Sequence, residues 1–549
     1  MIPHGGMKAR KAQEPPQEDR NLYSRKPAGR SDVLARQGVV ASSQPLATQA
    51  GLEIIRRGGN AIDAAVTTAA VLDVVEPFST GCGGDAFALI HLPGRNRPIS
   101  INGSGRSGSL VRLDDLLEKA WTSMPLRSGA PVTVPGAMHL WFHLVETYGA
   151  LEMSDVLAPA IQYARDGFPV SSLIAQTWSK LVDVLINDDA RKTYTIDGRA
   201  PRLGETMRNP DLARTFEMVA AEGLQSFYSG KIADAIVTTV QEHGGFLTLE
   251  DLQSHTTQET SPVSTSYRGM DIFEHPPNGQ GFAALVMLNL MEQFDFSECA
   301  SLSAQRYHLM IEAKKLAYAD LHQHNADPSF YSVPMDELLS KEYARERSKL
   351  IDKTASMTEY TSGIPVGGDT VYFAAADGEG RAVSFINSLY MGFGSGLVVP
   401  GTGIKLQNRG NLFSLDPGHP NCYAPKKLPF HTIIPGALYR DGDLAGVFGI
   451  MGGAHQAQAH AQFVGNLVDY EMKPQAALDH PRFNHSQERN LVALENAIPP
   501  SARSELRRLG HVIVREAASV FGGGQAILRI EDSWIAGSDH RKDGQAAGF

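Results

Sequence analysis

The spacing of apolar residues changes about two thirds of the way along the chain. Over residues 150–350, apolar side chains recur every three or four positions, which is typical of helices that bury one face. Beyond about residue 365 the period becomes two, which is typical of strands. The pattern therefore predicts a helix-rich part followed by a sheet-rich part. The clearest helix is expected to start at Ser303, with its buried face formed by Tyr307, Met310, Ile311, Ala317, Tyr318 and Leu321.

Two hairpins are predicted in the sheet-rich part. The first joins strands Thr370–Ala376 and Arg381–Ser388 through the turn "DGEG". The second joins Thr432–Tyr439 and Asp443–Ile450 through "DG". Thr370 is thus expected at the first position of a strand, close to the point where the period changes.

Two helices are predicted near the start of the regular sequence. In "VASSQPLATQAGLEIIRRGGN", Ser42 or Ser43 is expected to cap the first helix, and Gly58-Gly59 to end it. The second helix is expected from Asn60 to about residue 73. It is rich in alanine, which permits close packing against a neighbouring element.

Composition is that of an ordinary globular protein. The chain has 549 residues, 42% apolar and 20% charged, and a formal net charge of −10. Basic residues between positions 8 and 30 are interrupted by acids and prolines, so no nucleic-acid partner is expected. The longest apolar run, near 61–75, contains Asp63 and Asp73 and is too short to cross a bilayer. No membrane association is expected.

The cysteines do not suggest a metal or disulfide site. Cys82, Cys299 and Cys422 lie far apart, without the spacing of zinc ligands. No apolar segment typical of a secretory signal follows Met1. These features favour a reducing compartment, and we expect a cytoplasmic protein without a metal or organic cofactor.

Histidine pairs and one glycine-rich block receive structural interpretations. His322 and His324 diverge on a helix and are expected at the surface. His455 and His460 are likewise not expected to face one site. The block "GCGGD" at 81–85 lacks the lysine of a phosphate loop, and its cysteine is interpreted as a buried thiol.

Thr370 offers two interpretations. As a β-branched residue it suits the start of a strand. Alternatively, cleavage of the Asp369–Thr370 bond would give it an α-amine with a pKa of about 7.7 to 8.0, so that one residue would carry both base and nucleophile. Gly367 and Gly368 before this bond permit the strained backbone that self-cleavage requires. From the residue alone, both interpretations stay open.

A second element of this chemistry lies at Gly452-Gly453. These glycines fall between a predicted strand and a helix expected to begin near His455. Amide groups at a helix N-terminus carry positive dipole character, which suits an oxyanion hole for acyl transfer. Most Gly-Gly pairs are simply turns, so this signal has weight only together with others.

Seven blocks of the sequence, in order, carry a resemblance to a known family: "VASSQPLATQAGLEIIRRGGNAIDAAVTTAAVLDVVEPFSTGCGGD", "VPGAMHLW", "HPPNGQG", "GDTVYFAAADGEGRAVSFINS", "GFGSGLVVPGTGIKLQN", "GGAHQAQAHAQ" and "SDHRKDGQAAG". From about residue 40 to the end, the chain resembles the γ-glutamyltransferase (glutathione hydrolase) family of N-terminal-nucleophile hydrolases. The resemblance implies an α+β fold, a four-layer αββα sandwich, and autocleavage between Asp369 and Thr370. It further implies that Thr370 is the nucleophile, that Gly452 and Gly453 form the oxyanion hole, and that Ser388 assists.

The resemblance also implies an organisation into two chains. Residues 1–34 are expected to be a disordered tail, 35–369 a helix-rich large chain, and 370–549 a sheet-rich small chain, together forming one intertwined domain. The expected partners are a small-molecule amide substrate and the two chains for each other. A homodimer of such processed heterodimers is a further expectation.

The substrate-binding residues depart from the family pattern. An arginine expected in the large chain is offset by two positions, at Arg106. The acid that binds a substrate ammonium is replaced by Leu412, and an anion-binding Arg409 stands where the family has glutamine. The gain of an arginine and the loss of an acid favour substrates that carry anionic groups. The expected substrate-binding residues are Arg106, Arg409, Tyr390, Asn411, His431 and Thr432.

The leading expected function is hydrolysis of γ-glutamyl amides such as glutathione. The segment "PGHPNCYAPKK" is shorter than the family's lid over the active site, so hydrolysis is expected to dominate over transfer to an acceptor amine. One alternative is hydrolysis of a non-amino acidic amide, as in the oxamate amidohydrolase-like and cephalosporin acylase-like members of a short-lid branch. Another is an unprocessed, non-enzymatic homologue that acts as a binding protein.

Overall fold

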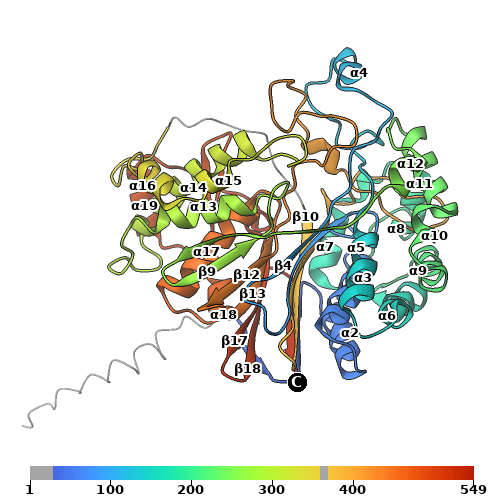
Figure 1. Cartoon of the computed structure of the whole chain (residues 1–549), viewed down its shortest axis with the longest axis horizontal. Coiled ribbons are helices and arrows are strands. Elements are labelled where there is room, and N and C mark those ends of the chain that lie inside the picture. The colour runs from blue at the N-terminus through green and yellow to red at the C-terminus, as the bar shows by residue number, and fades with distance from the viewer. Residues whose placement is uncertain (1–28, 359–368) are drawn as a thin grey trace, which may run out of the picture.

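A computed structural model describes residues 29–358 and 369–549, so residues 1–28 of the expected tail and the pair Gly367-Gly368 lie outside the described ranges. Two antiparallel sheets lie face to face, and helices cover both outer faces (Figure 1). The expected four-layer αββα sandwich is therefore confirmed. We call the two large sheets Sheet I and Sheet II. No helix in these two described ranges is long and apolar enough to cross a membrane.

Sheet I carries the strand that contains Thr370. Its order is β19 (Gln545–Gly548), β2 (Gly38–Ser42), β10 (Asp369–Asp377), β11 (Ala382–Tyr390), β3 (Asp85–His91), β4 (Ile99–Gly103) and β7 (Gln258–Thr260). Sheet II has the order β1 (Val33–Ala35), β18 (Ser533–Ser538), β17 (Gly523–Ile530), β13 (Asp443–Met451), β12 (Gly436–Arg440), β9 (Met270–Glu274) and β8 (Val263–Tyr267). Smaller sheets join β14 (Phe483–Ser486), β15 (Leu491–Leu494) and β16 (Val512–Val514), and β5 (Phe168–Pro169) with β6 (Thr206–Met207).

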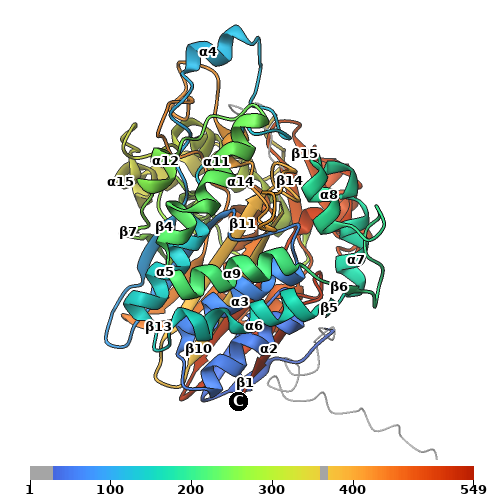
Figure 2. The same ribbon diagram turned by 90° about the vertical axis from the view of Figure 1, so that its right-hand side faces the viewer.

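Separate groups of helices cover the two sheets (Figures 1 and 2). The group on the side of Sheet I consists of α2 (Pro45–Arg56), α3 (Ala61–Val75), α5 (Ala137–Tyr148), α6 (Met153–Asp166), α7 (Ser172–Ser179), α8 (Asp188–Tyr194), α9 (Pro210–Glu222), α10 (Gln225–Tyr228), α11 (Lys231–Glu242) and α12 (Leu249–Gln253). Helix α4 (Leu113–Glu118) projects at the top of the molecule (Figure 1). The group on the side of Sheet II consists of α13 (Gly281–Met291), α14 (Ala304–His324), α15 (Met335–Leu338), α16 (Lys341–Ser348), α17 (His455–Asp469), α18 (Pro474–Asp479) and α19 (Pro500–Arg508).

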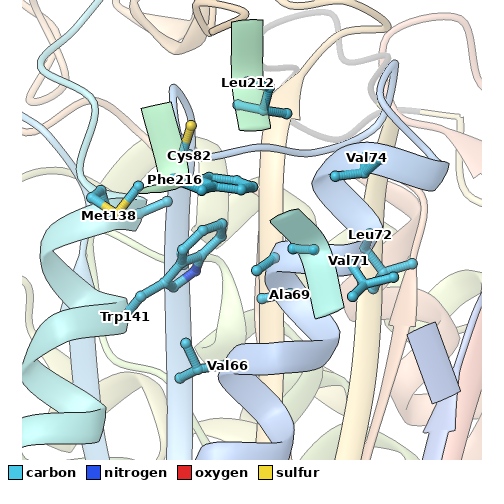
Figure 3. Packing of buried hydrophobic residues seen from close by; sticks show 14 of the residues in the cluster. Val66, Ala69, Val71, Leu72, Val74, Cys82, Met138, Trp141, Leu212 and Phe216 are labelled. Atoms are coloured by element: carbon cyan, nitrogen blue, oxygen red, sulfur yellow. The ribbon is translucent and has the colours of Figure 1, made fainter. Parts of the chain in front are cut away.

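Helix α3 shows why the alanine-rich sequence packs so closely. Its whole length is buried, and Asn60 caps it by accepting hydrogen bonds from the amides of Ile62 and Asp63. Small side chains let the helix lie directly against Sheet I, where Trp141 and Phe216 fill the remaining space (Figure 3). This rigid layer supports β10 and β11 from behind.

The cap of helix α2 differs from expectation. Strand β2 continues through Ser42, so the helix begins later and Gln44 caps it by accepting from the amide of Leu46 at 2.6 Å. Ser42 instead shares a hydrogen bond with Thr48, and Ser43 donates to Glu76 at 2.6 Å. Buried hydroxyls that already have partners do not cap.

Both predicted hairpins form, as β10–β11 and β12–β13. Strand β12 begins at Gly436 rather than Thr432, because the residues before it are tied into the centre described below.

The predicted division into a helix-rich part followed by a sheet-rich part is too simple. Strands β2, β3 and β4 come from the first hundred or so residues, yet they flank the β10–β11 hairpin in Sheet I.

Candidate active site

Thr370 lies at a β-bulge at the start of β10. Asp369 pairs with Tyr390 and Val371 with Asn387, so two residues of β11 stand opposite Thr370 alone. Bulges of this kind re-aim a side chain and are common next to active sites. Thr370 is only 2% exposed.

The Thr370 hydroxyl contacts Ser388. Their Oγ atoms are 3.0 Å apart. Ser388 Oγ also accepts from Nη2 of Arg409 at 3.0 Å and from the amide of Tyr390 at 2.8 Å. Either hydroxyl can be the donor in the contact between Ser388 and Thr370.

Arg409 is a fully buried cation at the start of a short 3₁₀ turn, Arg409–Leu412. Besides Ser388 it donates to Thr432 Oγ1 at 2.7 Å, and its guanidinium carbon lies 4.7 Å from the centre of the Tyr390 ring. Among the described residues its Nε atom has no partner, and no carboxylate is in ion-pair contact with it. Burial lowers the pKa of Arg409 to about 10, although Asp85 acts in the opposite direction.

Asp85 and His431 form a buried pair beside this arginine. Asp85 is opposite Ser388 in the β3–β11 register, and its carboxylate accepts from the amide of Gly105 and from Gln407, each at 2.9 Å. The Nε2 atom of His431 is 3.0 Å from the other carboxylate oxygen. Burial raises the pKa of Asp85 to about 7 against the opposing charge of Arg409. Burial also lowers the pKa of His431 well below its usual value, so the imidazole is neutral.

Gly452 and Gly453 follow β13 and precede α17, as predicted. Their φ angles are +132° and +60°, in the region that favours glycine. Within the described residues, their N–H groups make no hydrogen bond outside the strand ladders. Gln280 ties this turn to the centre, because its Nε2 donates to the carbonyls of both Gly453 and Thr432. A continuous set of contacts thus connects the glycines to Arg409, Ser388 and Thr370.

A family model of the gamma-glutamyltranspeptidases matches residues 47–549. The chain belongs to this family. It is 37% identical over 530 residues to the glutathione hydrolase-like YwrD proenzyme of Bacillus subtilis, covering 94% of this chain and 99% of the relative. It is 35% identical over 533 residues to the oxamate amidohydrolase proenzyme of Klebsiella pneumoniae, covering 94% and 100%.

Among solved structures, the chain is similar to cephalosporin acylase from Bacillus halodurans. The TM-score is 0.90 at 42% identity, and the match covers 98% of this chain and 99% of that one. The family resemblance is therefore confirmed, and the chain is a gamma-glutamyltranspeptidase-family amidohydrolase. These relatives act on different amides, so family membership leaves the substrate open.

Not every expected substrate-binding residue of this family member lies beside Thr370. Arg106 donates to Asp327 at 2.8 Å and to the carbonyl of Lys426 at 2.9 Å, and lines a separate cavity of about 60 Å³. Asn411 donates to the carbonyl of Met124. The hydrogen-bonded centre contains Arg409, Thr432 and the ring of Tyr390, whereas the bonds of Arg106 and Asn411 lead away from it.

Strain marks the end of β11. Tyr390 has a φ of +78°, which is costly for a residue with a side chain. The conformation places its amide on Ser388 Oγ and its ring against Arg409. Burial raises the pKa of the Tyr390 phenol to about 12, so it stays protonated at neutral pH.

Asp85 and Gln280 belong to the centre but are not among the predicted site residues. Both lie in the family-like blocks, Asp85 at the end of "GCGGD" and Gln280 in "HPPNGQG". A carboxylate directly before the apolar run of β3 is the available signal, because such a group must be buried with partners. Gly84 in the "GCGGD" block packs close to Ser388. A Cβ on Gly84 would lie 2.3 Å from the carbonyl oxygen of Ser388.

The prediction for His322 is wrong, and the prediction for Cys82 is confirmed. His322 is predicted to lie at the surface. It is 8% exposed, because α14 packs on nearly all sides, and it lines a cavity that also reaches Gly452. Cys82 is buried as expected, and burial raises the pKa of its thiol, which keeps it protonated.

Proposed function

We propose that Thr370 becomes the first residue of a small chain and acts as the nucleophile of an amide hydrolase. The observation that carries this is the 3.0 Å contact between the hydroxyls of Thr370 and Ser388, at a bulge that aims the threonine. The serine that holds the threonine hydroxyl is itself bonded to the buried guanidinium of Arg409, which links the threonine to a cation suited to a substrate. The names of the relatives as proenzymes also support processing of the precursor.

Processing begins when Thr370 Oγ1 attacks the carbonyl carbon of residue 369. The C–N bond breaks, the Thr370 amine takes a proton, and water hydrolyses the resulting ester. In turnover, the free amine accepts the hydroxyl proton as Oγ1 attacks the substrate amide. The amides of Gly452 and Gly453 stabilise the tetrahedral oxygen. The departing amine then takes the proton, and water hydrolyses the acyl-threonine ester.

The proposed substrates are amides whose acyl part carries a carboxylate but no ammonium group. Arg409 supports this, because a buried guanidinium without an ion-paired carboxylate among the described residues is suited to an anion from the substrate. Leu412, buried where the family places an ammonium-binding acid, offers no charge to an amino group. An oxamate-like or glutaryl amide meets both conditions.

A second candidate is the γ-glutamyl class, including glutathione. Asn411 favours it, because its Nδ2 is already bonded to a carbonyl and its amide oxygen is the atom that would accept from an ammonium. The similarity to a glutathione hydrolase-like relative points the same way.

A parallel assay separates the two candidates. Oxamate, a glutaryl anilide, γ-glutamyl p-nitroanilide and glutathione are incubated with purified processed protein. We expect the highest kcat/KM for a compound without the amino group. Faster cleavage of γ-glutamyl p-nitroanilide than of the glutaryl anilide would instead establish the second candidate.

The nucleophile is tested on a denaturing gel and by mass spectrometry. Wild-type protein should give two chains, with Thr370 at the new amino terminus, whereas Thr370→Ala should stay as one inactive chain. Active, uncut wild-type protein would overturn the assignment of Thr370. A wild-type chain that is neither cut nor active would instead favour the binding-protein alternative.

We further propose that water is the main acceptor. The segment from Asp416 to Lys427 is short and held close to the body, with Asn421 donating to the carbonyl of Leu412 at 2.7 Å. A segment too short to form a lid that keeps water out favours hydrolysis. Glycylglycine should therefore raise turnover by less than about twofold. Many-fold acceleration would show that transfer predominates.

A further inference from the structure

A cavity of about 370 Å³ borders the Gly452 turn. Its walls come from α14, the start of α17, the β14–β15 segment, and the loop after β11. Neither Arg409 nor Tyr390 lines it. Gly452 thus borders this cavity, while the buried arginine is not part of its lining.

The inner wall of this cavity presents nitrogen atoms. Lys314 is 1% exposed, and its Nζ lies 2.9 Å from Oε1 of Gln487, 3.2 Å from Nδ1 of His485 and 3.9 Å from the centre of the Tyr318 ring. Among the described residues, no carboxylate is in contact with it. Burial consequently lowers the pKa of Lys314 well below its usual value. A carboxylate entering the cavity would supply the missing counter-charge.

His455 adds a second group that lacks a partner. It is 3% exposed and lines the same cavity, and neither ring nitrogen has a hydrogen-bond partner among the described residues. A buried polar ring without a partner is costly unless a ligand or water meets it.

Acidic groups of the cavity lie only at its exposed rim, as far as its described lining goes. Glu488 and Glu516 are both exposed, and Glu516 is 3.7 Å from the side chain of Arg489. The buried wall therefore repels no anion, and its donors suit carboxylate oxygens.

We propose that this cavity binds the leaving-group half of the substrate, and that Lys314 binds a carboxylate on the departing amine. The inference rests on the proposed function, because it needs Gly452 to border the reacting carbon. The acyl part then stays on the Arg409 side as the ester of Thr370. When the C–N bond breaks, the amine takes the proton held by the Thr370 amino group and leaves through the cavity.

Matched pairs of substrates test the inference. Glutaryl-glycine and glutaryl-glycinamide share an acyl group and differ only in the carboxylate of the leaving group. The corresponding γ-glutamyl pair covers the second acyl candidate. With wild-type protein, the glycine compound should have a kcat/KM about tenfold higher than the glycinamide compound.

Substitution locates the effect. Lys314→Met should lower kcat/KM for the glycine compound about tenfold and leave the glycinamide compound within about twofold. Lys349→Met, a matched change at the exposed end of helix α16, should alter neither. Inhibition of wild-type protein by free glycine, but not by glycinamide, provides a measurement that does not depend on a folded variant.

The possible failures are distinguishable. Equal kcat/KM for the two members of a pair in wild-type protein, or equal losses for both in Lys314→Met, would overturn the leaving-group site while the proposed function stands. Absence of cleavage of all four compounds by processed protein would overturn the proposed substrate classes and this inference with them.

Discussion

The hydroxyl of Ser388 is a shared hydrogen-bond partner of Thr370 and its neighbours. It contacts Thr370 Oγ1 and accepts from Arg409 and from the amide of Tyr390. Ser388→Ala removes the hydroxyl that contacts the proposed nucleophile and the acceptor of a buried guanidinium nitrogen. We expect kcat/KM to fall about 100-fold, measured on processed protein.

Ser384→Ala provides the matched control for this change. Ser384 is also buried on β11, and it shares a hydrogen bond with the Tyr372 hydroxyl at 2.8 Å. Its loss should cost stability but change kcat/KM by less than about threefold. Similar kinetic losses in both variants would show that Ser388 acts only through packing.

Asp85 makes the stability of the protein depend on pH. Its pKa is raised to about 7 in the folded protein, above the ordinary value of 3.8, so the folded state holds a proton that the unfolded state has lost. This contribution is complete below about pH 4 and is lost as pH rises to about 7, at about 1.4 kcal/mol per pH unit. Asp85→Asn cannot lose that proton.

Melting temperatures of the two proteins test this sign. Both are measured in the Thr370→Ala background, so that processing does not differ. The melting temperature of the protein that keeps Asp85, relative to that of the Asp85→Asn variant, should fall between pH 4.5 and 7 and level off above that. A constant difference would contradict the raised pKa.

The sequence predicts individual residues unevenly. Thr370 and Ser388 lie in a block that resembles the family and on a predicted hairpin, and the structure places their hydroxyls 3.0 Å apart. Asp85 is missed because its role depends on Arg409 and His431, which are more than 300 positions away and meet it only in the fold. The exposure of His322 is predicted wrongly because a helix buried on nearly all sides shows no separate polar and apolar faces in its sequence.

The turn between β13 and α17 carries the proposed oxyanion hole. Gly452 has a φ of +132°, and a Cβ there would lie 3.2 Å from Gly522 Cα. Gly452→Ala must therefore shift the turn and the amides that it presents. We expect kcat to fall about 100-fold or more.

Gly442→Ala is a control with similar backbone strain. Gly442 lies in the β12–β13 turn with a φ of +86°, and its nearest outside atom is 3.7 Å away. It should lower the melting temperature without changing kcat. Equal loss of kcat in both glycine variants would mean that strain in this hairpin, rather than amide position, limits turnover.

Elements whose sequence shows a clear hydrophobic period or a turn motif can be predicted, whereas fully buried strands cannot. The β10–β11 hairpin follows from alternation around "DGEG". Strand β3 is buried along its entire length, so its continuous apolar run resembles a buried helix segment as much as a strand. Its place beside β11 becomes visible only when the sheet is assembled.

The two sheets interleave segments from both sides of the Asp369–Thr370 bond. In Sheet I, β10 and β11 lie between β2 and β3, and in Sheet II, the block from β18 to β12 lies between β1 and β9. In each sheet, hydrogen-bonded strand pairs therefore join the predicted large chain to the predicted small chain. The apolar layer between the sheets also contains side chains from both. Separating the chains would expose this layer and break both ladders.

We therefore predict that processed protein behaves as one body of about 59.4 kDa in the absence of denaturant. Native mass spectrometry should give the summed mass of both chains or a whole multiple of it, and urea should unfold them in one transition monitored by tryptophan fluorescence and circular dichroism. The unprocessed Thr370→Ala protein is the reference, since its parts cannot dissociate. Release of either chain at a urea concentration below the unfolding midpoint would contradict the prediction, because strands interleaved in this way cannot leave while the sheets remain folded.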